Sequence, residues 1–320
     1  MKITSQITVV ISLLLIIGSC SPNTNINSKI NSEQTTPHSN QWDSITPFSE
    51  GLAGFKKDSL WGFMNRKGEV IIPAQYEFIR NFQLGTCSVA KGDPNSNSWH
   101  AKEGLIDVSG NLLLPIIYDR ISDVHEGLRS VIINDSVGFV DSRGEFIIPI
   151  SLPFGFDEAL PEFHENRCAI LTDLEKEHYG FIDTTGVFVI EPNLTLWGGA
   201  AAYHYPIFSD GLCVYQSNKK FGFMDVHGRS VIPAKFDGAD DFSEGLAAVL
   251  INGQVQFINV KGEIAIDAQF GPTDTGAIGF YYGSFKEGRC EVILEWDGDS
   301  PYGENTVYGV IDSKGNILEK

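Results

Sequence analysis

The sequence predicts an all-β protein built from seven tandem copies of a short antiparallel β-meander. Three observations lead to this fold class. A Phe-Ser-Glu-Gly-Leu-Ala motif at Phe48 recurs in degenerate form, glycines recur in pairs six residues apart, and each pair encloses two apolar residues followed by Asp or Asn. Short apolar runs bounded by such turn residues are typical of β-strands joined in hairpins.

The opening motif sets the length of the repeat. After Phe48, its first position is occupied by Phe82, Val124, Phe163, Phe208, Phe242 and Phe285. Successive copies therefore begin between 34 and 45 residues apart. A period of this size is typical of repeat arrays and propellers, in which each repeat is one small supersecondary unit.

The glycine pairs mark a hairpin inside each repeat. The pairs are Gly62 and Gly68, Gly104 and Gly110, Gly138 and Gly144, Gly180 and Gly186, Gly222 and Gly228, and Gly309 and Gly315, while the sixth repeat has Gln256 and Gly262. An Asp or Asn side chain at the start of the turn accepts a local backbone hydrogen bond, and the second glycine adopts positive φ without steric cost. This chemistry predicts a type I turn closed by a glycine bulge.

These turns divide the first repeat into strands that we expect at residues 52–56, 60–65 and 69–72, followed by a short Tyr-Glu segment. Proline follows the third strand in five repeats, at Pro73, Pro115, Pro149, Pro192 and Pro233. Because proline cannot donate to a strand ladder, we expect these residues at a strand end or at a sheet edge.

The two ends of the chain bear on whether the array closes. Residues 42–48 align with residues 118–124, the closing part of a unit, and the seventh repeat stops at Leu318, where that part should follow. If the ends share one unit, the fold is a propeller-like ring, which we expect. The alternative is an open curved β-repeat array whose ends are simple caps.

The segment Leu60-Trp61-Gly62-Phe63-Met64-Asn65-Arg66-Lys67-Gly68 resembles the WG (KWG) repeat family, and the pattern covers residues 42–320. Only the first copy contains a literal Trp-Gly pair. The resemblance implies a bacterial, frequently exported interaction array, and it transfers no catalytic residues.

Residues 1–19 resemble a lipoprotein signal peptide. The apolar run at residues 7–17 would span roughly 16 Å as a helix, too short for a bilayer core of roughly 30 Å. The following Ile17-Gly18-Ser19-Cys20 resembles a lipobox, which implies cleavage before Cys20 and acylation of its sulfur. Ser21 in place of aspartate implies the outer membrane, with the periplasmic or surface face undecided. The alternative is an ordinary signal peptide with an incidental cysteine.

Residues 20–40 are polar and contain almost nothing that could form a core, so we expect a flexible tether before the repeat domain at residues 41–320. The formal net charge is −18. So acidic a chain is a poor partner for nucleic acid and for anionic lipid surfaces.

Four cysteines besides Cys20 stand five residues after an opening position, namely Cys87, Cys168, Cys213 and Cys290. Ala53 and Ala247 fill the same position in other repeats, which indicates a small buried slot. Equivalent positions of separate repeats should lie beyond the roughly 7 Å Cα separation that a disulfide allows, so we expect free thiols.

No metal site, cofactor or catalytic residue is predicted. His125 and His164 each follow an opening position, and we expect them to be turn residues rather than ligands, because no histidine pair has zinc-like spacing. The acidic residues Glu50, Glu126, Asp210, Glu244 and Glu287 share one repeated turn position, which indicates a structural role.

Insertions beyond the minimal repeat carry the candidate ligand-binding residues, because loops on a rigid scaffold are where binding residues collect. These candidates are aromatic: Trp99, Trp197, Tyr203, Tyr205, Tyr281, Tyr282, Trp296 and Tyr302. Aromatic rings in loops offer contact area at low entropic cost, although the same rings could fold back over the repeat core.

Together these features predict a non-catalytic cell-envelope lipoprotein whose repeats form a scaffold for a protein or peptide. The first alternative is a glycan-binding lipoprotein that uses the aromatic loops. The second alternative is an enzyme, which would need acid, base or metal groups converging from several repeats at a ring mouth.

Overall fold

The computed structural model describes residues 41–92, 101–154, 159–173, 178–195, 206–270, 284–295 and 306–320. The chain divides into two units, Met1–Pro37 and His38–Lys320, of which the first lies outside the described residues. The described part of the second unit is all-β, and it contains no helix that could span a membrane.

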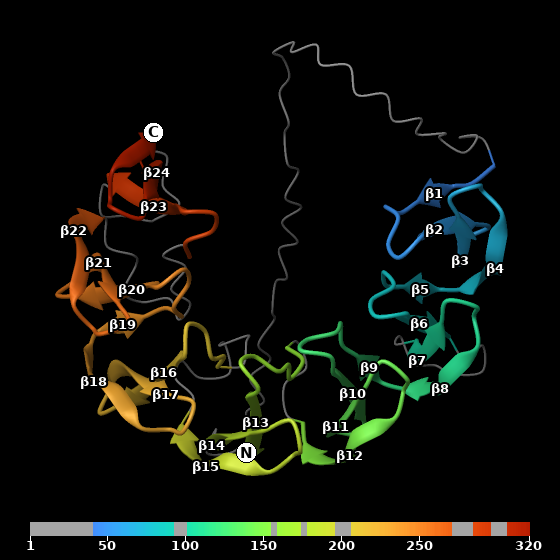
Figure 1. Cartoon of the computed structure of the whole chain (residues 1–320), viewed down its shortest axis with the longest axis horizontal. Helices are drawn as coiled ribbons and strands as arrows, with labels where there is room; N and C mark the ends of the chain where they lie inside the picture. The colour runs from blue at the N-terminus through green and yellow to red at the C-terminus, as the bar shows by residue number, and fades with distance from the viewer. Residues whose placement is uncertain are drawn as a thin grey trace, which may run out of the picture. The chain divides into compact units, whose positions relative to one another are not determined.

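Seven small antiparallel sheets follow one another in chain order (Figure 1). The first sheet contains β1 (Ser44–Ile45), β2 (Leu52–Lys57), β3 (Leu60–Asn65) and β4 (Val70–Tyr76), hydrogen-bonded in that order. The second contains β5 (Phe78–Ile79), β6 (Thr86–Lys91), β7 (Lys102–Asp107) and β8 (Leu112–Tyr118); the third contains β9 (Arg120–Ile121), β10 (Arg129–Ile133), β11 (Ser136–Val140) and β12 (Phe146–Pro153).

The remaining sheets repeat this meander with three or four strands. The fourth contains β13 (Cys168–Asp173), β14 (His178–Ile182) and β15 (Phe188–Thr195); the fifth contains β16 (Leu212–Ser217), β17 (Lys220–Asp225) and β18 (Ser230–Phe236). The sixth contains β19 (Gly238–Ala239), β20 (Leu246–Ile251), β21 (Gln254–Asn259) and β22 (Ile264–Phe270); the seventh contains β23 (Arg289–Glu295), β24 (Val307–Asp312) and β25 (Ile317–Glu319).

The N-terminal segment belongs to the first sheet. Strand β1 pairs with β2, in the register Ser44↔Lys56 and Ile45↔Phe55, and it takes the same place as β5, β9 and β19 in their sheets. The expectation that the two chain ends share one unit is therefore wrong, because the closing part of a unit supplies the first strand of the next sheet. Among the described residues, no strand pairing joins the first sheet to the seventh.

The hairpin turns have the predicted chemistry. In the first repeat the carbonyl of Asn65 accepts a hydrogen bond from the Gly68 amide at 3.0 Å, and the Asn65 side-chain oxygen accepts from the amides of Lys67 and Glu69. Gly68 has a φ of 80°, which favours glycine. Equivalent bonds close the other six turns, at Gly110, Gly144, Gly186, Gly228, Gly262 and Gly315.

The first glycine of each pair is required by the third strand. We expected the third strand to end at Ile72. Strand β4 instead bulges at Pro73 and continues to Tyr76 along the sheet edge. A Cβ atom on Gly62 would lie 2.4 Å from the carbonyl oxygen of Ile72, so the bulge in this repeat requires glycine, whereas the sixth repeat has Gln256 at the equivalent position. The edge position predicted for proline is confirmed.

Neighbouring sheets are joined by pairs of phenylalanine rings. A phenylalanine on the middle strand of one repeat packs against the opening phenylalanine of the next, with ring centroids 4.7 to 5.3 Å apart. The pairs are Phe63 and Phe82, Phe139 and Phe163, Phe181 and Phe208, Phe223 and Phe242, and Phe257 and Phe285. Each repeat therefore completes its core against its neighbours, as in other linear repeat proteins.

The four cysteines of the repeats are buried and free, as predicted. The thiol of Cys87 donates to the carbonyl of Arg80 at 3.0 Å, and burial raises the pKa of this thiol to about 12. These side chains act as small core residues.

Candidate functional site

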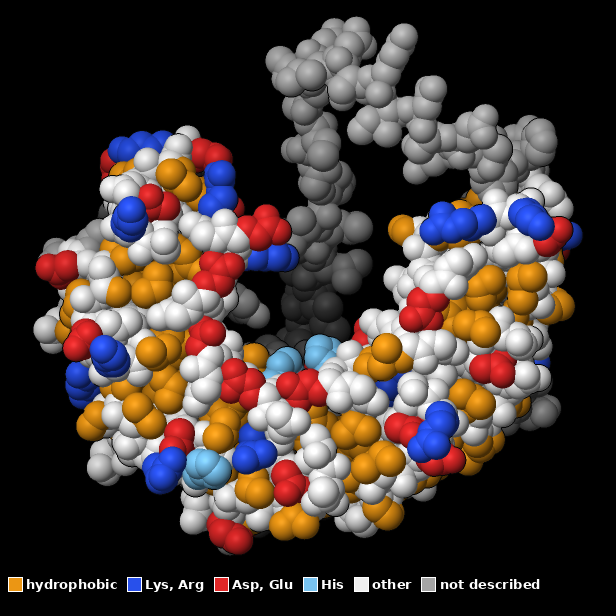
Figure 2. Space-filling view, in the orientation of Figure 1, with side chains coloured by type: hydrophobic (Ala, Val, Ile, Leu, Met, Phe, Trp, Pro, Cys, Tyr) orange, Lys and Arg blue, Asp and Glu red, His pale blue; other side chains and the backbone are white. Residues whose placement is uncertain are grey.

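Two rows of repeated residues stand out on the second unit. The first, which we call the outer-strand row, consists of exposed apolar side chains on the last strand of every sheet. Its members are 37% to 56% exposed: Val70, Ile71, Leu112, Ile117, Phe146, Ile147, Val189, Val231, Ile264, Ile317 and Leu318. Figure 2 shows hydrophobic side chains reaching the surface between charged ones. A repeated apolar row on sheet edges is a feature that monomeric surfaces usually avoid.

The second row consists of the opening turns, at residues 49–52, 83–86, 125–128, 164–167, 209–212, 243–246 and 286–289. Carboxylates link successive turns. Glu50 accepts a hydrogen bond from the Gly85 amide at 2.8 Å, and Glu126 accepts from the amides of Glu165 and Asn166 at 2.6 and 2.7 Å. Glu165, Asp210 and Glu244 make the same kind of bond to the following turn. The structural role predicted for the repeated acidic residues is confirmed for Glu50, Glu126, Asp210 and Glu244.

In two repeats the residue before the carboxylate also contacts the next repeat. The hydroxyl groups of Ser49 and Ser243 donate to the backbone carbonyls of Phe82 and Phe285, at 2.7 and 2.6 Å. The third and fourth turns carry His125 and His164 at this position. Both are turn residues, as predicted, and both are half-buried.

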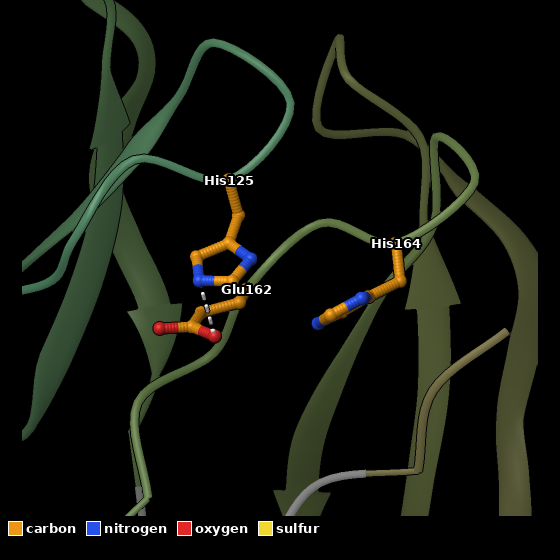
Figure 3. Close-up of side chains that lie close together, drawn as sticks. All are labelled: His125, Glu162 and His164. Carbon is orange, nitrogen blue, oxygen red and sulfur yellow. Dashed lines mark ion pairs between the residues drawn. The ribbon is translucent and has the colours of Figure 1, made fainter. Parts of the chain in front are cut away.

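Figure 3 shows that these two histidines come together with a carboxylate. Glu162 lies just before the fourth opening turn, and its Oε2 is 3.0 Å from Nε2 of His125. The two imidazole rings have centroids 5.3 Å apart. One ligand atom from each of His125, Glu162 and His164 lies within 4.8 Å of the others, so the group could hold a metal ion.

The electrostatic environment of this cluster is mixed. Burial raises the pKa of Glu162, and the charge of Asp123 raises it further, whereas His125 and Arg80 act in the opposite direction. Arg80 and Asp123 form an ion pair of 3.7 Å beside the cluster. The carboxyl group of Glu162 is therefore less acidic than that of a free glutamate, and a nearby cation would stabilise its ionised form.

The cluster was not predicted from the sequence because its histidines do not have the short spacing of known zinc motifs. His125 and His164 belong to successive repeats and occupy the same position in each. Equivalence between neighbouring repeats was the available signal, because adjacent repeats place equivalent turn positions side by side.

The predicted ligand-binding residues Trp99, Trp197, Tyr203, Tyr205, Tyr281, Tyr282, Trp296 and Tyr302 lie outside the described residues, as does Cys20. Their roles stay predictions.

The model of the WG containing repeat matches the chain at residues 41–61, 61–93, 104–135, 179–195 and 221–254. No curated protein matches the sequence. The matched segments coincide with parts of the first six sheets, and the hairpin turn that four of them contain is also present in the seventh sheet.

Among solved structures, the chain is similar to a eukaryotic initiation factor, with 9% identity, 84% of both chains covered and a TM-score of 0.41. It is also similar to a dihydro-heme d1 dehydrogenase, with 12% identity, 86% of this chain and 66% of that chain covered, and a TM-score of 0.43. A third is an inactive virginiamycin B lyase from Staphylococcus aureus with quinupristin, with 12% identity, coverages of 71% and 83%, and a TM-score of 0.32. These TM-scores are too low for any conclusion about this chain. The repeated hairpin and the five family matches show instead that the chain carries WG-containing repeats.

Proposed function

We propose that this chain is a non-catalytic, lipid-anchored scaffold of the cell envelope that binds a protein or peptide along its outer-strand row. The observation that carries the proposal is the repetition of exposed apolar side chains on the last strand of all seven sheets. A partner that covers several sheets at once removes this apolar area from water, at roughly 25 cal/mol per Å².

The chemistry of the row supports a polypeptide over a sugar. Its members are almost all aliphatic, and aliphatic side chains provide apolar contact without the directional hydrogen bonds that a saccharide needs. Proline interrupts the donor pattern on five of the outer strands, at Pro73, Pro115, Pro149, Pro192 and Pro233. These residues disfavour simple addition of a partner strand, so the side chains are expected to make most of the contact.

The anchoring part of the proposal is supported by the sequence alone. The apolar run at residues 7–17 followed by Cys20 would leave an acylated N-terminal cysteine, and residues 21–40 would link it to the repeats. In cells that are fed a labelled fatty acid, the chain should carry the label in the membrane fraction, and Cys20→Ala should abolish both the label and the membrane association.

The binding part is tested by capture of envelope proteins on the purified chain and on a variant with Ile147→Lys and Val189→Lys. We expect the variant to retain less than about a tenth of the captured partner, because each lysine places a charge in an apolar contact. Glu145→Lys is the matched control, since it places a lysine next to the row at an exposed polar position. A partner captured equally well by the variant and by the unchanged chain would contradict the proposal.

The glycan alternative has its own test in a saccharide array probed with the same chain. Saccharide binding that is lost on Trp197→Ala or Trp296→Ala, and unaffected by the lysine variant, would replace the polypeptide proposal with a glycan-binding function.

A further inference from the structure

We propose that His125, Glu162 and His164 bind one divalent transition-metal ion, with Zn²⁺ as the preferred ion, and that the ion fastens the third opening turn to the fourth. The inference goes beyond the proposed scaffold function and does not depend on it. It rests on the positions of the three side chains, on their chemistry, and on the way their turns are held.

The positions suit a small ion. Around a tetrahedral zinc ion with Zn–N distances of ~2.0–2.1 Å, ligand atoms lie about 3.3 Å apart. His125 Nε2 and Glu162 Oε2 are already 3.0 Å apart, and all three ligand atoms lie within 4.8 Å of one another. The His164 side chain points toward Glu162 in Figure 3, and a rotation that brings its ring nitrogen closer would complete the set of three ligands.

The turns that carry the ligands are held together independently of any ion. The carboxylate of Glu126, next to His125, accepts hydrogen bonds from the amides of Glu165 and Asn166, which follow His164. This double link fixes the two turns beside each other, so metal binding would not have to order the backbone. Preorganised ligands lower the entropic cost of binding.

The ligand set selects the class of ion. Two imidazoles and one carboxylate are typical of zinc sites that keep a fourth position for water or another ligand. Calcium and magnesium prefer shells made of oxygen atoms, so they should compete weakly. The neighbouring Cys168 is not expected to contribute, because burial and the charge of Glu162 raise the pKa of its thiol well above the usual range.

The turn itself does not require histidine at these positions. Ser49, Ser209 and Ser243 occupy the equivalent position, and two of them use the hydroxyl to bond the next repeat. The third and fourth turns have histidine at this position, in adjacent repeats, and the second histidine follows Glu162 by two residues. A shared ligand explains why the substitutions occur as neighbours.

The repeats also supply a conservative test. In the untagged full chain, stripped of metal with a chelator, calorimetric titration with Zn²⁺ should show one ion bound per chain, and Co²⁺ should give the visible absorption of a tetrahedral site. The double variant His125→Ser and His164→Ser should bind Zn²⁺ at least about tenfold more weakly, since even the loss of an outer hydrogen-bonding partner typically costs 10–100-fold. Its far-ultraviolet circular dichroism should be unchanged, because serine fits the same turn elsewhere in the chain.

Two further variants and a stability measurement complete the design. Glu162→Gln should weaken Zn²⁺ binding to a similar degree, while His227→Ser, in an exposed hairpin turn, should leave it unchanged. Zn²⁺ should raise the thermal unfolding midpoint of the unchanged chain, but not that of the double variant. The proposal is overturned if the unchanged chain binds no Zn²⁺ at 100-fold molar excess, or if the double variant binds it with unchanged affinity, as it would if other histidines or thiols were the ligands.

Discussion

The junction between the second and third repeats is built differently from the other five. Each of the five has a pair of phenylalanine rings in its core and a carboxylate that bonds the next opening turn. The second junction has neither, because Leu105 and Val124 replace the two rings and Leu84 replaces the acidic residue. Other groups therefore hold the second sheet to the third.

Arg129 is the main substitute. It fills the slot that holds alanine or cysteine in every other repeat, and it is 1% exposed. Its guanidinium donates to the carbonyls of Ser122, Thr86 and Gln83 at 2.8, 3.1 and 3.3 Å. Burial lowers the pKa of Arg129, and the charge of Asp123 opposes that effect. The opening position of this repeat is Val124 rather than phenylalanine, so this junction has a buried cation where the other five have an aromatic pair.

The largest effect that we predict is for Arg129→Ala. The change leaves a cavity and removes the donors of several buried carbonyl groups, so the free energy of unfolding should fall by about 3 kcal/mol. Urea denaturation followed by circular dichroism measures it. Arg143→Ala, at an exposed hairpin turn, is the control and should change stability by less than about 0.5 kcal/mol. A loss below about 1 kcal/mol for Arg129→Ala would mean that Arg129 does not hold this junction together.

The second prediction converts the unusual junction toward the common type. Arg129→Cys alone should be strongly destabilising, whereas Arg129→Cys combined with Val124→Phe should recover about 1 kcal/mol or more, because the phenylalanine fills the vacated space. A double-mutant cycle measures this coupling. Strictly additive changes in the free energy of unfolding would show that residues 124 and 129 are not coupled.

These contrasts also show what the sequence could predict. Turn chemistry is local, so the hairpins could be predicted from Asn65, Gly68 and their equivalents. The alignment of the repeats predicted that Cys87 and its equivalents are buried and free. The bulge over Gly62 was not predictable from composition, because it depends on a backbone atom ten residues later. The Arg129 junction and the cluster around Glu162 depend on contacts between repeats, which periodicity within one repeat does not reveal.

The third prediction tests the carboxylate links of the common junctions. Glu244 accepts hydrogen bonds from the amides of Glu287 and Gly288, at 2.7 and 2.8 Å, so Glu244→Ala should lower the free energy of unfolding by about 1 kcal/mol. Glu287→Ala is a matched control, since Glu287 has nearly the same positive φ but no opening turn follows it in the described residues. Equal losses for the two variants would attribute the effect to the backbone conformation of the turn rather than to the link between turns.

The smallest predicted effect comes from adding the missing link to the unusual junction. Leu84 is exposed and has the same positive φ as the acidic residues at this position, so Leu84→Glu should place a carboxylate beside the amides of Glu126 and Gly127. We expect the free energy of unfolding to rise by about 0.5 kcal/mol, less than the link contributes elsewhere, because the side chain of Gln83 already bonds the Val124 amide and Glu126 itself repels a second negative charge.

The variant Leu84→Gln separates hydrogen bonding from charge, since it offers an acceptor of the same length without the repulsion. If the urea midpoint rises for glutamine and falls for glutamate, repulsion by Glu126 explains why this junction lacks the link. If both variants lower the midpoint, the second and third turns are not spaced as their neighbours are, and Arg129 is required by the backbone rather than by the loss of the carboxylate.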